Sequence, residues 1–183
     1  MILITTSRRP TRSIRTFCKD LSHTIPNTLR INRGKLSLDG LIEKALEVNA
    51  DKVVIIDRWK GGPGKIQLFI RGEKLQPVPP LIYLRGVKLR REFPGAMPKG
   101  KRIKSVAITA AQGESVEAEK LESTFSKFFG IPVISSGAVE GYDAVMQITH
   151  EQDVLTVTFK LVPGMVEIGP RMRISHLIWK LSL

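Results

Sequence analysis

The sequence is poor in cysteine and has no long apolar run. Its 183 residues include one cysteine, Cys18, so an internal disulfide and a Cys-x-x-Cys pair for zinc are both excluded. The longest segment without a charged residue, 128–139, is roughly half of the ~20 residues that span a bilayer. The first arginines follow a very short apolar run, which is the reverse of a secretory signal. These features exclude disulfide scaffolds and predict a soluble, cytoplasmic protein.

Motifs for catalysis, metal binding and cofactor binding are also missing. The glycines before Lys65 lack the Walker pattern, because Trp59 and Ile66 stand where glycine and serine or threonine are required. There is no GxGxxG motif, and the three histidines lie far apart without the spacing of metal ligands. Cys18 falls on the apolar face of an expected helix, which favours a core position. The sequence therefore predicts a protein that is not an enzyme and needs no cofactor or metal.

Positive charge is what the sequence has in excess. Lysine and arginine number 29 against 17 aspartates and glutamates, for a net charge of +12, while the hydrophobic fraction of 42% is ordinary for a globular protein. Residues 1–104 contain 23 of these cations and 8 acids, whereas 105–183 contain 6 and 9. This asymmetry indicates a localised positive field and a polyanionic partner, most often nucleic acid. The alternative is a solvated basic face without a partner.

The hydrophobic spacing predicts an α/β (α+β) protein with mixed sheets and packed helices. Strands are expected at 2–4, 29–31, 53–56, 66–70, 81–84, 106–108, 145–148, 154–161, 166–168 and 172–178, and helices at 11–21, 38–46 and 114–129. Pro77, Pro79 and Pro80 are expected to precede the strand at 81–84. Each half opens with a strand and a helix and later turns into hairpins, which indicates a duplicated unit. In the third helix, the glutamates at 117, 119 and 122 are expected on the solvent side.

We predict a single domain over 1–183, made of two halves. The N-terminal half is 1–93, a connector rich in proline, glycine and lysine is 94–104, and the C-terminal half is 105–183. The candidate RNA-binding cations are Arg8, Arg9, Arg12, Arg15, Lys19, Arg33, Lys35, Lys60, Lys65, Arg171 and Arg173. Further basic side chains of the first 104 residues are Arg85, Lys88, Arg90, Arg91, Lys99, Lys101, Arg102 and Lys104. Arginine predominates among the earliest of them, which suits bidentate phosphate contacts.

Trp59 has two interpretations. It lies between two cations beside a glycine turn, where it is either a base-stacking residue or a packed hairpin tryptophan. The segment Gly169-Pro170-Arg171 also has two. In one, Arg171 and Arg173 contact a phosphate; in the other, Pro170 shapes a bend and Gly169 gives clearance. Arg171 is alternatively a partner for a carboxylate of the other half.

Several motifs together resemble the Brix-domain family. Residues 4–11, Ile-Thr-Thr-Ser-Arg-Arg-Pro-Thr, resemble the T-S-R-x-P-S/T start of these proteins. Pro26-Asn27, Arg33-Gly34, the strand at 53–56 and the glycine turn at 61–63 follow in the order of the family, and 167–172 resembles its G-P-R signature. Eukaryotic members carry a G-P-T-A-x-F segment where 79–84 stands here. The chain resembles the archaeal branch of the family, and among its members it is most similar in kind to the Brix protein of the small-subunit processome.

The resemblance implies a role in ribosome biogenesis. It implies a non-catalytic factor that binds precursor ribosomal RNA and assists its processing or folding in subunit assembly. It also implies two similar α/β halves, each akin to the anticodon-binding domain of class II aminoacyl-tRNA synthetases. The C-terminal half is the candidate contact for ribosomal or assembly proteins, and no membrane contact is expected. The alternatives are a tRNA-binding module, an RNA-processing enzyme and a protein-interaction scaffold.

Overall fold

The computed structural model describes residues 1–94, 97, 100–111 and 115–182, which form two compact units. The first unit contains Met1–Ser22, Asn27–Gly86 and Ser175–Leu183, and the second contains His23–Pro26 and Val87–Ile174. The predicted connector 94–104 lies partly outside the described residues. The single domain with halves at 1–93 and 105–183 stays a prediction.

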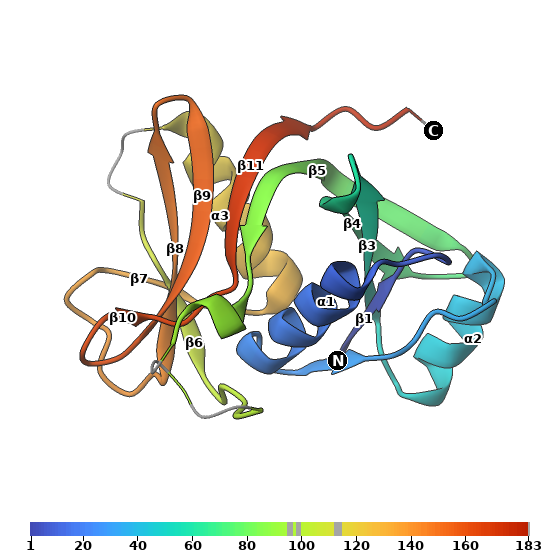
Figure 1. Cartoon of the computed structure of the whole chain (residues 1–183), viewed down its shortest axis with the longest axis horizontal. Coiled ribbons are helices and arrows are strands. Elements are labelled where there is room, and N and C mark those ends of the chain that lie inside the picture. Colours follow the sequence, from blue (N-terminus) through green and yellow to red (C-terminus); the bar gives the residue numbers. More distant parts are fainter. Residues whose placement is uncertain (95–96, 98–99, 112–114, 183) are drawn as a thin grey trace. The chain divides into compact units, whose positions relative to one another are not determined.

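The first unit is a mixed sheet with two helices. Its elements are β1 (Ile2–Thr6), α1 (Arg12–Thr24), β2 (Thr28–Arg30), α2 (Leu38–Glu47), β3 (Lys52–Trp59), β4 (Gly62–Arg71) and β5 (Leu75–Lys88) (Figure 1). The strand order is β2-β1-β3-β4-β5. Strand β1 is parallel to β2 and β3, whereas β4 pairs antiparallel with both β3 and β5. Both predicted helices of this half are confirmed.

The two helices of the first unit cover opposite faces of its sheet. Helix α1 connects β1 to β2, and α2 connects β2 to β3 on the other side of β1, so the two connections run in opposite directions across the sheet. Because both crossovers are right-handed, the two helices lie on opposite faces. Helix α2 packs Leu41 and Ala45 against Leu3 and Val53. Helix α1 buries its predicted apolar face completely, with Ile14, Phe17 and Cys18 at 0% exposure. Alternation along the buried strands supplies side chains to both cores.

The second unit repeats this order. It contains a 3₁₀ helix (Arg90–Glu92), β6 (Val106–Thr109), α3 (Val116–Phe129), β7 (Val133–Ile134), β8 (Ala144–Glu151), β9 (Val154–Leu161), β10 (Val166–Glu167) and the first four residues of β11 (Arg171–Ile178), whose last four belong to the first unit. Strand β6 is parallel to β7 and β8, and β9 pairs antiparallel with β8, β10 and β11. Residues 135–143 contain no helix where the first unit has α2. The predicted α/β class with two similar units is confirmed, whereas the likeness to an anticodon-binding domain stays a prediction.

Two predictions about local structure are wrong. Pro77, Pro79 and Pro80 lie inside β5, where Pro77 pairs with Phe69, because a strand tolerates proline at positions whose N–H the ladder does not need. Glu122 is buried at 8% exposure instead of facing solvent. Its carboxylate accepts a hydrogen bond from the N–H of Ala111 at 2.7 Å, which compensates for part of its desolvation. Helix α3 begins at Val116, and the predicted start, Glu114, lies outside the described residues.

No helix within the part of the chain that the structure describes has the length and apolar character needed to cross a bilayer.

Candidate nucleic-acid interface

The carboxyl ends of the parallel strands in the first unit meet at one edge. Strands β1, β2 and β3 run in the same direction, so the loops that follow them lie together. We call this surface the basic edge and define it by the exposed cations of those loops and of α1. Its members are Arg8, Arg9, Arg12, Arg15, Lys19, Lys35 and Lys60, all of them exposed. Seven of the eleven predicted residues therefore lie exposed on these loops and on α1, and their contact with RNA stays a prediction.

Two arginines tie the loops of the basic edge to each other. Arg8 Nε and Arg33 Nε both donate to the carbonyl oxygen of Leu36, at 3.5 and 2.7 Å. Arg33 also donates from Nη1 to the carbonyl oxygen of Thr6 at 3.5 Å. The loop after β1 is further held by the N–H of Ser7, which donates to the carbonyl of Ile56 at 2.9 Å. These bonds fix the backbone that presents the exposed arginines.

Arg33 is a buried member of the predicted set. Its exposure is 7%, and burial lowers the pKa of its guanidinium, with a further decrease from the charge of Arg8 and an opposing effect of Asp57. The guanidinium is engaged with main-chain carbonyls beneath the surface. Its position is that of a cation that holds two loops together, and its RNA contact stays a prediction.

Helix α1 begins with cations, at a position where the helix dipole favours acidic residues. Thr11 Oγ1 accepts a hydrogen bond from the N–H of Ile14 at 3.4 Å, so the helix starts beside the loop that carries Arg8 and Arg9. Its first turn contains no acidic residue and begins at Arg12. Because the amino end of a helix has partial positive charge, a cation there is unfavourable and an anion is favourable. The first turn of α1 therefore supplies no negative charge to its own N-terminus.

Helix α3 follows the first strand of the second unit, as α1 follows the first strand of the first unit. It has the opposite composition. Ser115 caps it by accepting the N–H of Ala118 at 3.2 Å, and Glu117 and Glu119 lie in its first turn. The two helices occupy equivalent places in a repeated topology, so the fold itself does not require cations at the start of α1. The difference points to a function for the cations.

The remaining cations of the predicted set have internal partners or belong to the second unit. Lys65 Nζ lies 3.8 Å from a carboxylate oxygen of Asp57 and is half-buried. Arg171 forms two hydrogen bonds with Glu167, one of them from Nε at 2.7 Å, and this raises the pKa of its guanidinium. Arg173 is exposed on β11. Arg171 therefore pairs with a carboxylate of its own half.

Gly169 provides the clearance that one interpretation of the Gly-Pro-Arg segment requires. Its φ of +66° lies in the left-handed region, and a Cβ there would lie 2.5 Å from Cε2 of Phe93. The Phe93 ring also faces Lys88 Nζ at 4.5 Å and the Arg171 guanidinium carbon at 5.5 Å. The segment thus closes tightly over an aromatic ring, as expected of a structural bend.

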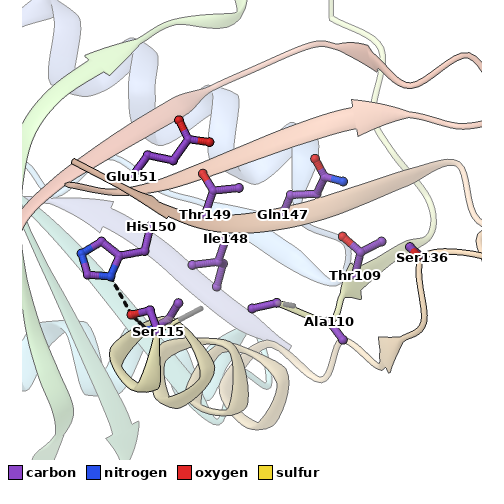
Figure 2. A pocket seen from close by; sticks show the side chains of 11 residues that line it. Thr109, Ala110, Ser115, Ser136, Gln147, Ile148, Thr149, His150 and Glu151 are labelled. Carbon is purple, nitrogen blue, oxygen red and sulfur yellow. Dashed lines mark hydrogen bonds between the residues drawn. The ribbon is translucent and has the colours of Figure 1, made fainter. Parts of the chain in front are cut away.

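A pocket of roughly 220 Å³ lies at the carboxyl ends of β6 and β8 (Figure 2). His150 Nδ1 and Ser115 Oγ are 2.6 Å apart at one side of it. Because Ser115 Oγ already accepts the N–H of Ala118, its hydroxyl is held as a helix cap. The described residues that line the pocket include Glu151 but no lysine or arginine. Over the described ranges, no three His, Cys, Asp or Glu side chains lie close enough to share a metal.

Three rings that lie far apart in the sequence meet in the first unit. The centroid of Trp59 lies 5.3 Å from that of Tyr83 in an edge contact, and Tyr83 stacks on His176 at 4.4 Å. Sequence reasoning singled out Trp59 alone. The alternation of residues along the strands does not predict that Tyr83 and His176 contact each other.

Comparisons with known proteins agree with the motifs. A probable Brix domain-containing ribosomal biogenesis protein of Aeropyrum pernix is 30% identical over 175 residues, which cover 94% of this chain and 93% of the relative. The protein of the same description from Pyrobaculum aerophilum is 30% identical over 185 residues, covering 98% and 96%. That of Pyrococcus horikoshii is 40% identical over 116 residues, and the match spans 60% of this chain and 50% of the relative.

Two solved structures resemble this chain over nearly its whole length. The crystal structure of a probable ribosomal biogenesis protein from Aeropyrum pernix superposes with a TM-score of 0.77 at 29% identity, covering 100% of this chain and 97% of the other. Mil, an archaeal Imp4-like protein, has a TM-score of 0.66 at 21% identity over 97% of this chain and 99% of its own, and shares the fold. No family model matches the sequence. Because the Aeropyrum and Pyrobaculum relatives match over nearly their whole length, the chain belongs to the family of archaeal Brix domain-containing ribosomal biogenesis proteins.

Proposed function

We propose that this protein binds precursor ribosomal RNA through the basic edge and assists its processing or folding during subunit assembly. The family supports a role in ribosome biogenesis. The charge distribution supports the RNA part of the proposal. By sequence, the first unit has 17 lysines and arginines against 7 acids, and the second has 12 against 10. A field concentrated on one unit attracts and orients a polyanion.

The observation that carries the proposal is the cationic start of α1. Arg12 and Arg15 are exposed in a first helical turn that contains no acidic residue, next to a loop whose backbone is fixed by Arg33. Main-chain N–H groups of a helix start and arginine side chains both bind phosphate oxygens. Such phosphate contacts position a protein on RNA, and a smaller number of base contacts supply specificity. This is a binding function and contains no chemical step.

The experiment that tests the proposal compares three nucleic acids with the full chain. Fluorescence anisotropy would measure binding to a ribosomal RNA precursor leader, to tRNA and to duplex DNA, each over a salt series. We expect a preference for the precursor that persists as salt rises. Equal binding to all three ligands that is lost together with salt would contradict it, since that behaviour belongs to any basic surface.

Charge reversal locates the interface. The double variant Arg12→Glu, Arg15→Glu should weaken precursor binding by roughly tenfold and reduce the slope of log K against log salt by at least about 1.5. The matched control is Lys120→Glu, Lys127→Glu, which changes the charge equally on exposed positions of α3. Unchanged affinity in the α1 variant, or an equal loss in both variants, would refute the assignment to the basic edge.

A further inference from the structure

Trp59 is unusually exposed for an aromatic residue in this chain. All eleven Trp, Tyr and Phe residues fall within the described ranges, and Trp59 alone among them is exposed, at 48%. It ends β3, and its register partner on β4 is Gly62, which has no side chain to cover the indole. An apolar ring of this size left uncovered has hydrophobic free energy available for a ligand.

The indole is nevertheless held firmly in place. A Cβ on Gly64 would overlap Cβ of Trp59 and lie 2.7 Å from its backbone nitrogen, so the hairpin closes tightly around this residue. The indole makes an edge contact with Tyr83, with planes at 72°, and Tyr83 stacks on His176 with planes only 10° apart. A ring fixed by its neighbours loses little conformational entropy when a ligand stacks on it.

Cations flank the exposed indole in the sequence. Arg58 and Lys60 adjoin Trp59 in the sequence, and both are exposed. Lys60 has a φ of +50° at the hairpin turn, so the backbone reverses directly after the indole. Bases of single-stranded RNA stack on exposed aromatic rings while nearby cations hold the adjacent phosphates. A duplex offers no such base face, because its bases are already stacked.

We propose that the aromatic cluster of Trp59, Tyr83 and His176 is a stacking site for an unpaired base of RNA, with Arg58 and Lys60 holding the flanking phosphates. This inference rests on the proposed function and specifies its ligand as a single-stranded segment. Trp59 supplies the stacking face. Tyr83 and His176 are positioning residues that keep the indole oriented toward solvent.

Two measurements test this site. The first compares Trp59→Ala with wild type for binding of labelled oligo(A) and of an RNA duplex of equal length. Stacking of one base predicts a loss of roughly 5- to 100-fold for the single strand, no change beyond about twofold for the duplex, and an unchanged salt slope. Trp59→Phe, which retains a stacking face, should recover most of the affinity. Equal affinity of Trp59→Ala and wild type for oligo(A), or equal losses on both RNAs, would overturn the proposal.

The second measurement leaves the site intact, and so remains informative if Trp59→Ala fails to fold. Trp179→Phe makes Trp59 the single tryptophan, whose fluorescence should be quenched by oligo(A) and unaffected by the duplex at equal saturation. Binding without quenching would refute the stacking site. If Arg12→Glu, Arg15→Glu abolishes binding while the Trp59 variants behave as wild type, the stacking site is wrong and the proposed function stands. If wild type binds the precursor leader but not oligo(A), the stacking site is likewise wrong and the proposed function stands. If wild type binds neither oligo(A) nor the precursor leader, both proposals fail.

Discussion

Replacing Gly169 by alanine should destabilise the second unit far more than an ordinary glycine substitution. The φ of +66° at Gly169 disfavours any side chain, and the added Cβ would lie 2.5 Å from Cε2 of Phe93. The Phe93 ring has little freedom to move aside, because Lys88 and Arg171 lie against it. Backbone strain and steric overlap therefore act together at this position.

The magnitude follows from these two effects. Left-handed backbone costs an L-residue about 1–2 kcal/mol, and overpacking adds about 1–3 kcal/mol, so Gly169→Ala should lose about 2–5 kcal/mol of unfolding free energy. Gly130 is the matched control. It belongs to the same unit and has a φ of +67°, but a Cβ added to it would meet no atom within 4 Å. Gly130→Ala should therefore show the backbone cost alone.

Urea unfolding followed by circular dichroism would measure both variants, with Phe93→Ala, Gly169→Ala completing a double-mutant cycle. Removing the ring should relieve the overlap, so the double variant should be more stable than the sum of the single effects by about 1–3 kcal/mol. The reasoning is refuted if Gly169→Ala is no less stable than Gly130→Ala. It is also refuted if the cycle shows no coupling with Phe93.

Three further predictions concern buried or capping groups. Burial raises the pKa of the Cys18 thiol to about 12, with Arg30 opposing. The unfolded thiol ionises first as pH rises, so stability relative to Cys18→Ala should fall by about 1 kcal/mol per pH unit above pH 9.0 in urea titrations; a constant difference would contradict this. Glu122→Ala should lose about 2–3 kcal/mol in thermal or urea unfolding and Glu122→Gln less, since glutamine keeps an acceptor for Ala111. Ser37→Ala should cost about 1 kcal/mol, because the serine caps α2 through the N–H of Gly40 at 3.0 Å; an unchanged midpoint would exclude that cap.

Periodicity predicted the helices because their buried faces obey local spacing. Ile14, Phe17 and Leu21 repeat on one side of α1, and the structure buries all three. Glu122 shows the limit of this reasoning. Its burial depends on the N–H of Ala111, which lies in another segment, and no local pattern contains that partner. The prolines of β5 are a similar case, since their tolerance depends on pairing with β4.

The candidate site was predictable to the extent that it is made of exposed charge. Arg8, Arg12 and Arg15 follow from helix spacing and lie on the surface as expected. Arg33 has the same appearance in the sequence, yet tertiary contacts bury it beneath two loops. The contact of Tyr83 with His176 joins strands remote in the sequence and could not be inferred without the fold.

The contrast between the starts of α1 and α3 bears on the stability of the protein in the cell. At α3, glutamates of the chain supply the negative charge that the helix end favours; at α1, a bound phosphate would supply it. If the protein binds RNA as we propose, RNA would stabilise the native state, and an RNA concentration a hundred times the Kd would add about 2.7 kcal/mol to the free energy of unfolding. The amount of folded protein would rise and fall with the supply of its RNA, without a dedicated regulator.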